Sequence, residues 1–172
     1  RFYCEEYLSL INGANSHLEI GPGHGLYLAY LLNSCPGISV EAWDISQESI
    51  DKTADCLSKL QVPQTVTFKT QDLFEAQSAN KRDSIVISEV LEHLEQPNEA
   101  LNLIGEMLKP DGLTFINMPI NSPAIDHIYN LPDPESVLKM IEDAGLEIKK
   151  SKFEPATNYS LKEARQKKLC IN

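Results

Sequence analysis

The chain has 172 residues, of which 42% are hydrophobic and 23% charged, and its twenty-five acidic and fifteen basic side chains give a formal charge of -10. This length suits a single domain (residues 1–172) with one core, and the ordinary apolar share excludes a disordered tail or a fibrous repeat. The negative charge disfavours nucleic acid and anionic membranes as partners, because the basic residues gathered late in the chain alternate with acidic ones.

Short apolar runs alternate along the chain with segments of helical periodicity. The apolar and β-branched runs predict strands at residues 17–20, 39–45, 65–70, 84–88, 113–118 and 146–153. The periodic segments predict helices at residues 26–32, 46–60, 97–108 and 135–144. The motif Pro110-Asp111-Gly112 is predicted to be a turn. This alternation predicts an α/β fold, doubly wound around a mostly parallel sheet with helices on both faces.

A glycine-rich turn joins the first predicted strand to the helix that follows it. The turn is Gly21-Pro22-Gly23-His24-Gly25, and its glycines let a ligand approach the main chain and the helix N-terminus without a Cβ in the way. Asp44 closes the second strand about 20 residues further on, where a carboxylate can accept hydrogen bonds from a ribose. The spacing GxGxG has Leu26 where the dinucleotide fingerprint needs a glycine. The pattern predicts an adenosine ligand and argues against NAD.

Five motifs follow one another along the chain: LEIGPGHG (18–25), EAWDIS (41–46), QDLFE (71–75), SIVISEVLEHL (84–94) and LKPDGLTFINMP (108–119). In this order and spacing they resemble the class I S-adenosylmethionine-dependent methyltransferases, especially the small-molecule and ubiquinone-pathway-like enzymes. The resemblance implies a Rossmann-like fold and S-adenosyl-L-methionine as cofactor. The sheet of that family usually ends with a seventh, antiparallel strand. Only residues 169–172 could begin it here, so we expect this strand to be truncated.

The resemblance places one set of cofactor contacts at the ends of the first two strands. Glu19 and the Gly21–Gly25 turn would contact the methionine end of the cofactor. Asp44 would hold the ribose hydroxyls, and Ile45 would pack on the adenine. Because the carboxyl ends of parallel strands meet at one edge of a sheet, we expect these groups to surround one crevice.

A second set of implied contacts follows the third and fourth strands. Asp72 would accept a hydrogen bond from the adenine amino group, with the main chain of Leu73 beside it. The other implied contacts line the methionine and methyl end of the cofactor, and they are Ser88, Glu89 and Val90. Their alternative role is that of polar caps at strand ends.

Methyl transfer to oxygen or carbon usually requires removal of a proton, and two histidines are candidates for the base. His127 lies with Tyr129 in a proline-bearing loop after the fifth strand, and long loops of this kind in compact domains are usually functional. We expect His127 to be the base, with His93 as the second candidate and Tyr129 as a hydrogen-bond partner of the substrate. Two polar residues in a surface loop are the competing interpretation.

The motif Glu89-x-x-Glu92-His93 allows a metal-dependent alternative. If this segment is helical, the two carboxylates share a face with the imidazole alongside, and the three groups could bind a divalent cation. A similar ExxEH motif holds magnesium in the RNA 3′-terminal 2′-O-methyltransferases. We expect no metal here, because metal-free members of the resembled family share the string EVLEHL.

The leading hypothesis is a methyltransferase with a small-molecule acceptor, and O- or C-methylation is favoured over N-methylation. The alternatives are an RNA methyltransferase, an NAD-binding oxidoreductase domain and a non-catalytic cofactor-binding module.

Four cysteines without CxxC spacing, and no apolar stretch near the ~18 residues of a membrane span, predict a cytoplasmic protein. Because the chain starts with Arg1, we expect its natural N-terminus upstream, and both a longer multidomain chain and a homodimer stay open.

Overall fold

A computed structural model describes residues 2–62, 66–76, 80–155, 160, 162–163 and 166. The chain divides into two compact units. The first unit comprises residues 1–88 with 106–116, and the second comprises residues 89–105 with 117–172. Within the described ranges, no helix has the length and apolar character that crossing a membrane requires.

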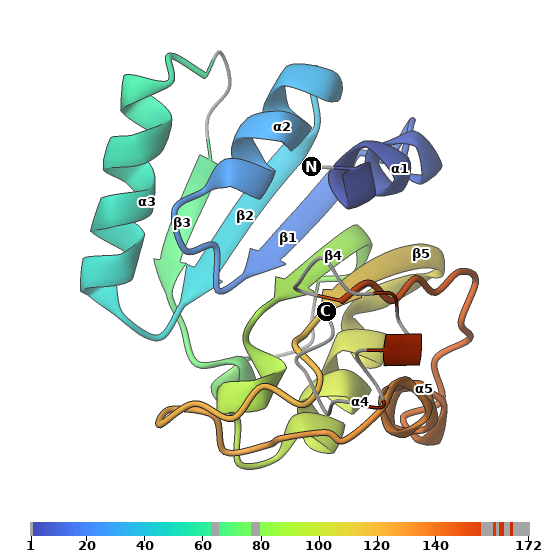
Figure 1. Ribbon diagram of the computed structural model, residues 1–172. Coiled ribbons are helices and arrows are strands. Elements are labelled where there is room, and N and C mark those ends of the chain that lie inside the picture. The colour runs from blue at the N-terminus through green and yellow to red at the C-terminus, as the bar shows by residue number, and fades with distance from the viewer. Residues whose placement is uncertain are drawn as a thin grey trace. The chain divides into compact units, whose positions relative to one another are not determined.

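The first unit is built on a five-stranded sheet with the order β3-β2-β1-β4-β5 (Figure 1). Its strands are β1 (Ser16–Ile20), β2 (Ser39–Asp44), β3 (Val66–Thr70), β4 (Arg82–Ser88) and β5 (Leu108–Asn117). The pairings of β1 with β2, β1 with β4 and β2 with β3 are all parallel. The register aligns Ile20 with Trp43 and Trp43 with Lys69, so the carboxyl ends of these strands lie at one edge. The predicted α/β class with a mostly parallel sheet is confirmed.

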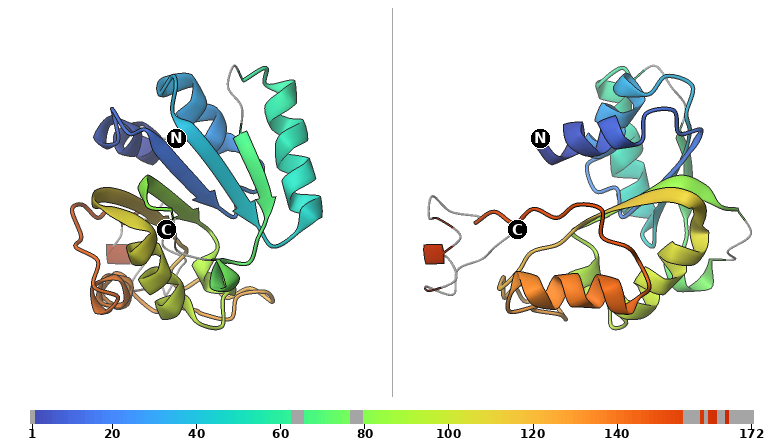
Figure 2. Two further views of the ribbon diagram at one scale, coloured as in Figure 1. Left: turned by 180° about the vertical axis from the view of Figure 1, so that it is seen from behind. Right: turned by 90° about the vertical axis from the view of Figure 1, so that its right-hand side faces the viewer.

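Three helices of the first unit pack against one face of this sheet. They are α1 (Phe2–Leu10), α2 (Leu26–Ser34) and α3 (Gln47–Lys59), and Figure 2 shows them from two further directions. Their buried leucines join Val40, Ala42 and Val86 of the strands in one hydrophobic core. Because side chains alternate along a strand, these three residues identify the face of the sheet that the helices cover. Helix α1 was not predicted from the sequence.

Polar side chains are also buried on this covered face. His17 and Ser84 are neighbours in the β1–β4 register, both are fully buried, and His17 Nδ1 lies 2.5 Å from Ser84 Oγ. The Tyr7 hydroxyl of α1 lies 3.1 Å from Ser84 Oγ and donates to Ile85 O. Burial lowers the pKa of His17 to about 3, so its ring is neutral near pH 7. These hydrogen bonds attach α1 to β4 and give His17 a structural role.

The second unit contains the short helix η2 (Leu91–His93), most of α4 (Pro97–Met107) and α5 (Pro134–Asp143). Asp133 caps α5, because its Oδ1 accepts the Ser136 N–H at 2.8 Å. The helix ends just before Gly145, whose left-handed φ of +76° a glycine adopts without strain. Both long helices lie where the sequence predicted them.

Two predictions about strands are wrong. Strand β5 begins at Leu108 and runs through the predicted turn at residues 110–112. A Cβ on Gly112 would lie 2.9 Å from Arg82 O, so this glycine permits a close approach of two backbones instead of a turn. Residues 146–153 form no strand, and no strand of the described part of the chain pairs with them. Residues 169–172, the predicted start of a seventh strand, lie outside the described residues.

Candidate functional site

The turn between β1 and α2 holds three glycines in left-handed conformations, with φ of +66° at Gly21, +52° at Gly23 and +71° at Gly25. A Cβ on Gly25 would lie 3.0 Å from Thr53 Cγ2, so this glycine allows close packing against α3. A Cβ on Gly23 would meet no described atom within 4 Å, and its carbonyl accepts a hydrogen bond from Thr53 Oγ1 at 2.6 Å. Gly23 therefore keeps free space beside a fixed main chain, which is where a ligand can approach.

Glu19 lies near the end of β1 and is 3% exposed. Its Oε2 has no hydrogen-bond partner among the described residues. Burial raises the pKa of Glu19 to about 8. A buried polar atom without a partner is costly, and a cationic or N–H-bearing ligand would remove that cost. Glu19 therefore has the properties of a ligand-binding carboxylate.

Two aspartates lie at the carboxyl ends of β2 and β3, at the same edge of the sheet. Asp44 Oδ1 accepts the Ser46 N–H at 2.9 Å, and Asp72 Oδ1 accepts the Phe74 N–H at 2.9 Å. The Gln71 N–H donates to Asp44 O at 2.9 Å and links the ends of β2 and β3. Each aspartate uses one oxygen to hold its own side chain in place, which leaves the other oxygen able to accept a hydrogen bond from a ligand.

The residues beside these aspartates differ in what they can offer a ligand. Ile45 is 73% exposed and presents an apolar surface beside Asp44. Leu73 begins the short helix η1 (Leu73–Glu75), and its side chain is buried, so only its main chain is available. Ser88 ends β4 and is half-buried. This arrangement suits a flat apolar group on Ile45 and a polar group on Asp44.

Glu89 and Val90 belong to the second unit. Glu89 has a left-handed φ of +55°, its N–H donates to Asn117 O at 2.8 Å, and its Oε1 accepts the Asn117 Nδ2–H at 2.7 Å. Burial raises the pKa of the Glu89 carboxyl. The segment from Glu89 to His93 is not one helix, because the helical residues are 91–93 and Glu89 is held outside them by its hydrogen bonds with Asn117. Strained non-glycine residues of this kind cluster at functional sites.

Three side chains of the second unit meet in a group that we call the Glu92 cluster: Glu92, His93 and His127. One potential ligand atom from each lies within 4.8 Å of the others. Glu92 is 1% exposed, and neither of its carboxylate oxygens has a hydrogen-bond partner among the described residues. Burial raises the pKa of Glu92. The two imidazoles contact each other edge to face, with ring centroids 5.1 Å apart.

Main-chain carbonyls orient both imidazoles of this cluster. His93 Nδ1 lies 2.8 Å from Asp126 O, and His127 Nδ1 lies 2.6 Å from Ser122 O. A carbonyl only accepts hydrogen bonds, so in the neutral rings each Nδ1 carries the proton and each Nε2 keeps its lone pair. Both Nε2 atoms are therefore able to accept a proton or to bind a cation.

Tyr129 is half-exposed, and its loop is attached to the cluster through the main chain. The N–H groups of Ile128 and Tyr129 donate to Glu92 O at 2.8 and 3.0 Å. The structure thus brings His127, His93 and the Tyr129 main chain together within one unit. From the sequence, Glu92 was expected only as a possible metal ligand. Asn117 was not predicted, and its place at the end of β5 is the signal that could have identified it.

We expect turnover to survive treatment with EDTA, as the metal-free interpretation predicts. Two imidazoles and one carboxylate suit magnesium poorly, because this ion prefers oxygen ligands. The measurement is the rate of S-adenosylhomocysteine release before and after chelation. A loss of rate that zinc or manganese restores would make the Glu92 cluster a metal site and His127 a ligand.

A family model described as a methyltransferase domain matches residues 18–114. The chain belongs to this methyltransferase domain family. The matched residues begin in β1, include the glycine turn and both aspartates, and end in β5. The resemblance inferred from the five motifs is therefore confirmed.

This methyltransferase domain is 29% identical over 165 residues to the ubiquinone biosynthesis O-methyltransferase of Rickettsia felis. That comparison covers 82% of this chain and 65% of the relative, so the chain spans less than two thirds of the relative's length. Among solved structures, a SAM-dependent methyltransferase from Aquifex aeolicus is similar with a TM-score of 0.67 at 21% identity, covering 98% of this chain and 86% of that one.

A second solved structure with the same fold carries a different description. The [4+2]-cyclase SpnF is similar with a TM-score of 0.74 at 19% identity, covering 98% of this chain and 62% of that one. Identities this low establish the fold alone. The activity of the methyltransferase domain must therefore be argued from its own side chains.

Proposed function

We propose that this methyltransferase domain binds S-adenosyl-L-methionine and transfers its methyl group to oxygen or carbon of a small-molecule acceptor. The observation that carries the proposal is the series of glycines and carboxylates at the carboxyl ends of β1, β2 and β3, all within the first unit. Glu19 supports it most directly, because its buried Oε2 has no hydrogen-bond partner in the part of the chain that the structure describes, and this oxygen fits a cationic group. When bound, the cofactor supplies the methyl group and the sulfur from which it departs.

Each group of the proposed cofactor site has a distinct task. Glu19 holds the ammonium of the methionine end, and the Gly21–Gly25 turn gives its main chain to the same end. Asp44 accepts hydrogen bonds from the ribose hydroxyls, and the exposed Ile45 side chain packs on the adenine. The remaining contacts proposed from the family resemblance are those of Asp72, Leu73, Ser88, Glu89 and Val90.

Proton removal from the acceptor is assigned to the Glu92 cluster. His127 Nε2 takes the proton from the acceptor as the new bond to the methyl carbon forms, and His93 Nε2 is the second candidate. The carbonyls of Ser122 and Asp126 support these roles, because they hold the protons on the opposite ring nitrogens. Tyr129 offers its hydroxyl as a hydrogen-bond partner of the acceptor.

A small-molecule acceptor fits the chain better than nucleic acid does. The formal charge of -10 opposes binding to phosphates, which argues against the RNA methyltransferase alternative. Leu26 in place of a third glycine argues against NAD. A cytoplasmic location, and a place within a longer chain or a homodimer, belong to the same proposal.

Asp44→Ala should weaken the binding of S-adenosylhomocysteine at least tenfold. The variant loses charge-assisted hydrogen bonds to the ribose, worth about 1.5–3 kcal/mol. Isothermal titration calorimetry measures the affinity, and circular dichroism checks the fold, because Asp44 also accepts the Ser46 N–H. Asp51→Ala is the matched control, since Asp51 is an exposed aspartate on α3. Unchanged affinity in a folded Asp44→Ala protein would remove Asp44 from the proposed site.

The affinity for S-adenosylhomocysteine should rise with pH and level off above about 8, the pKa of Glu19. Below that pH the buried carboxyl is protonated, and it must lose its proton before it can hold the ligand's ammonium. Titrations from pH 6 to about pH 9 measure both the rise and the plateau. 5′-Methylthioadenosine lacks the ammonium, so its affinity should not depend on pH in this range. The Glu19→Gln variant should bind S-adenosylhomocysteine without this pH dependence. A pH dependence that persists in Glu19→Gln would show that another group is responsible.

A further inference from the structure

The first unit has a groove on the face of its sheet opposite the helices α1 to α3. Trp43 and Leu18 line it, whereas Ala42, the neighbour of Trp43 along β2, lies in the helix-covered core. Side chains alternate along a strand, so these two sets of residues belong to opposite faces. The groove, which we call the indole groove, has a volume of about 360 Å³. This volume falls at the small end of the range for small-molecule sites.

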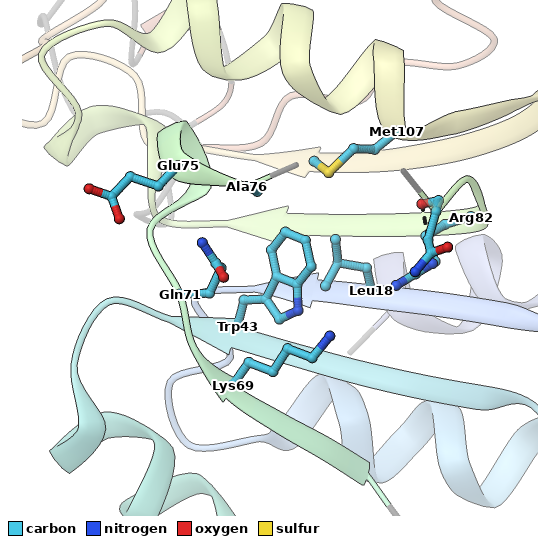
Figure 3. Close-up of a pocket in the computed structure, with 9 residues that line it drawn as sticks. Leu18, Trp43, Lys69, Gln71, Glu75, Ala76, Arg82 and Met107 are labelled. Atoms are coloured by element: carbon cyan, nitrogen blue, oxygen red, sulfur yellow. Dashed lines mark hydrogen bonds between the residues drawn. The ribbon is translucent and has the colours of Figure 1, made fainter. Parts of the chain in front are cut away.

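The floor of the indole groove is apolar. The indole of Trp43, the Leu18 side chain and the Met107 thioether line it, and all three residues are buried (Figure 3). In Figure 3 the indole lies between Lys69 and Met107, with Leu18 beside it. A flat aromatic ring packs well on such a surface, because an indole and a thioether both make favourable contacts with aromatic groups.

One wall of the groove carries two cations that share a single carboxylate. Glu41 Oε2 accepts from Lys69 Nζ at 2.9 Å, and Glu41 Oε1 accepts from an Arg82 terminal nitrogen at 2.7 Å. Trp43 Nε1 also donates to Glu41 Oε2, at 3.0 Å. Glu41 holds these cations from beside the groove, and the acidic residue among those that line it is Glu75, which is exposed and whose carboxylate points away from the indole in Figure 3. The wall therefore has one positive charge more than Glu41 compensates.

Counted over the described residues, both cations keep donors for a further acceptor. An ammonium has three N–H donors, and Lys69 gives one to Glu41. A guanidinium has five, and Arg82 gives one to Glu41 and one to Asn80 O. Arg82 is 8% exposed, so its remaining donors are shielded from bulk water. An ionic hydrogen bond is stronger in such a shielded place than in water. One surplus charge with unused donors suits a monoanion such as a carboxylate.

We propose that the indole groove is a second ligand site, which takes a small aromatic carboxylate. The ring packs against Trp43, and the carboxylate accepts from Lys69 and Arg82. Neither the glycine turn nor Asp44 nor Asp72 lines this groove, so the site is separate from the proposed cofactor site and does not depend on it.

Benzoate is the probe that tests this proposal, and Trp43 is the reporter. The chain has a single tryptophan, so its one indole N–H signal in a ¹H–¹⁵N NMR spectrum belongs to Trp43. We expect a saturable shift of this signal with benzoate, at a dissociation constant in the millimolar range expected for so small a ligand. Benzyl alcohol, which has the ring without the charge, and acetate, which has the charge without the ring, should each bind at least tenfold more weakly. Equal binding of all three compounds would overturn the proposal.

Two variants should change the benzoate affinity in opposite directions. Lys69→Met keeps the apolar stem and should weaken binding about tenfold, because a charge-assisted contact is lost. Glu41→Gln removes the competing carboxylate and should tighten binding several-fold. Lys59→Met is the matched control, since Lys59 is ion-paired to Asp55 on α3 and does not line the groove. Equal effects of Lys69→Met and Lys59→Met would overturn the assignment.

A competition experiment separates this site from the cofactor site. Saturating S-adenosylhomocysteine should leave the benzoate affinity unchanged. Displacement of benzoate would place it in the cofactor site and overturn the proposal. If S-adenosylhomocysteine fails to bind at all while benzoate still shifts the Trp43 signal, the proposed methyltransferase function is wrong. The proposal that the indole groove binds an aromatic carboxylate is then kept.

Discussion

His127→Ala should lower kcat about 10²–10⁴-fold while the affinity for S-adenosylhomocysteine stays almost unchanged. The expectation rests on the hydrogen bond between His127 Nδ1 and Ser122 O, which leaves Nε2 as the proton acceptor in the neutral ring. The rate of S-adenosylhomocysteine release with an acceptor selected from a panel of hydroxylated small molecules measures kcat, and calorimetric titration measures the affinity.

A second substitution at this position distinguishes proton transfer from simple contact. His127→Gln keeps a side-chain N–H that can donate to Ser122 O, but it has no basic nitrogen, so kcat should fall as in His127→Ala. An unchanged kcat with a raised KM in both variants would make His127 a substrate contact only. His93→Ala measures the second candidate, and a larger loss there than in His127→Ala would reverse their order.

Gly23→Val should abolish cofactor binding and leave the fold largely intact. The Cβ of the new residue would extend into space in which no described atom lies within 4 Å, so the fold has room for it and the ligand loses its path to the main chain. The left-handed φ of +52° adds a strain of about 1–2 kcal/mol for a side chain with a Cβ. Calorimetric titration with S-adenosylhomocysteine and chemical unfolding measure the two effects separately.

Gly37→Val is the matched control for this variant. Gly37 follows α2, has a left-handed φ of +85°, and a Cβ there also meets no described atom within 4 Å. It should therefore suffer a comparable loss of stability and keep its affinity for S-adenosylhomocysteine. Global unfolding of Gly23→Val alone would show that this glycine serves the fold before it serves a ligand.

The family and most elements of the fold could be predicted from the sequence because their signals are local. The apolar run at residues 84–88, the Ser46 cap and the glycine turn each lie within a few consecutive residues. The turn at residues 110–112 was mispredicted for the same reason, since Pro-Asp-Gly is a local turn signal. In the structure, Gly112 instead meets Arg82 O from another strand.

The proposed cofactor residues could be predicted because strand order fixes where strand ends lie. Once β1, β2 and β3 are parallel neighbours, Glu19, Asp44 and Asp72 must come to one edge. The hydrogen-bond partners and pKa values of these side chains could not be predicted in this way. The raised pKa of the Glu19 carboxyl, and the lack of a hydrogen-bond partner for its Oε2 among the described residues, depend on the residues packed around it.

Only the tertiary structure decided the two other arrangements on which the proposals rest. Glu92 and His127 are far apart in sequence, and they meet because Ile128 and Tyr129 bind the Glu92 carbonyl. Lys69 and Arg82 meet at Glu41 because strand pairing and folding bring β2, β3 and β4 into one sheet. The sequence by itself determined the family and the edge of the sheet at which we propose that the cofactor binds, since both follow from local motifs and strand order. It left these clusters undetermined, because contacts between distant residues depend on register and packing.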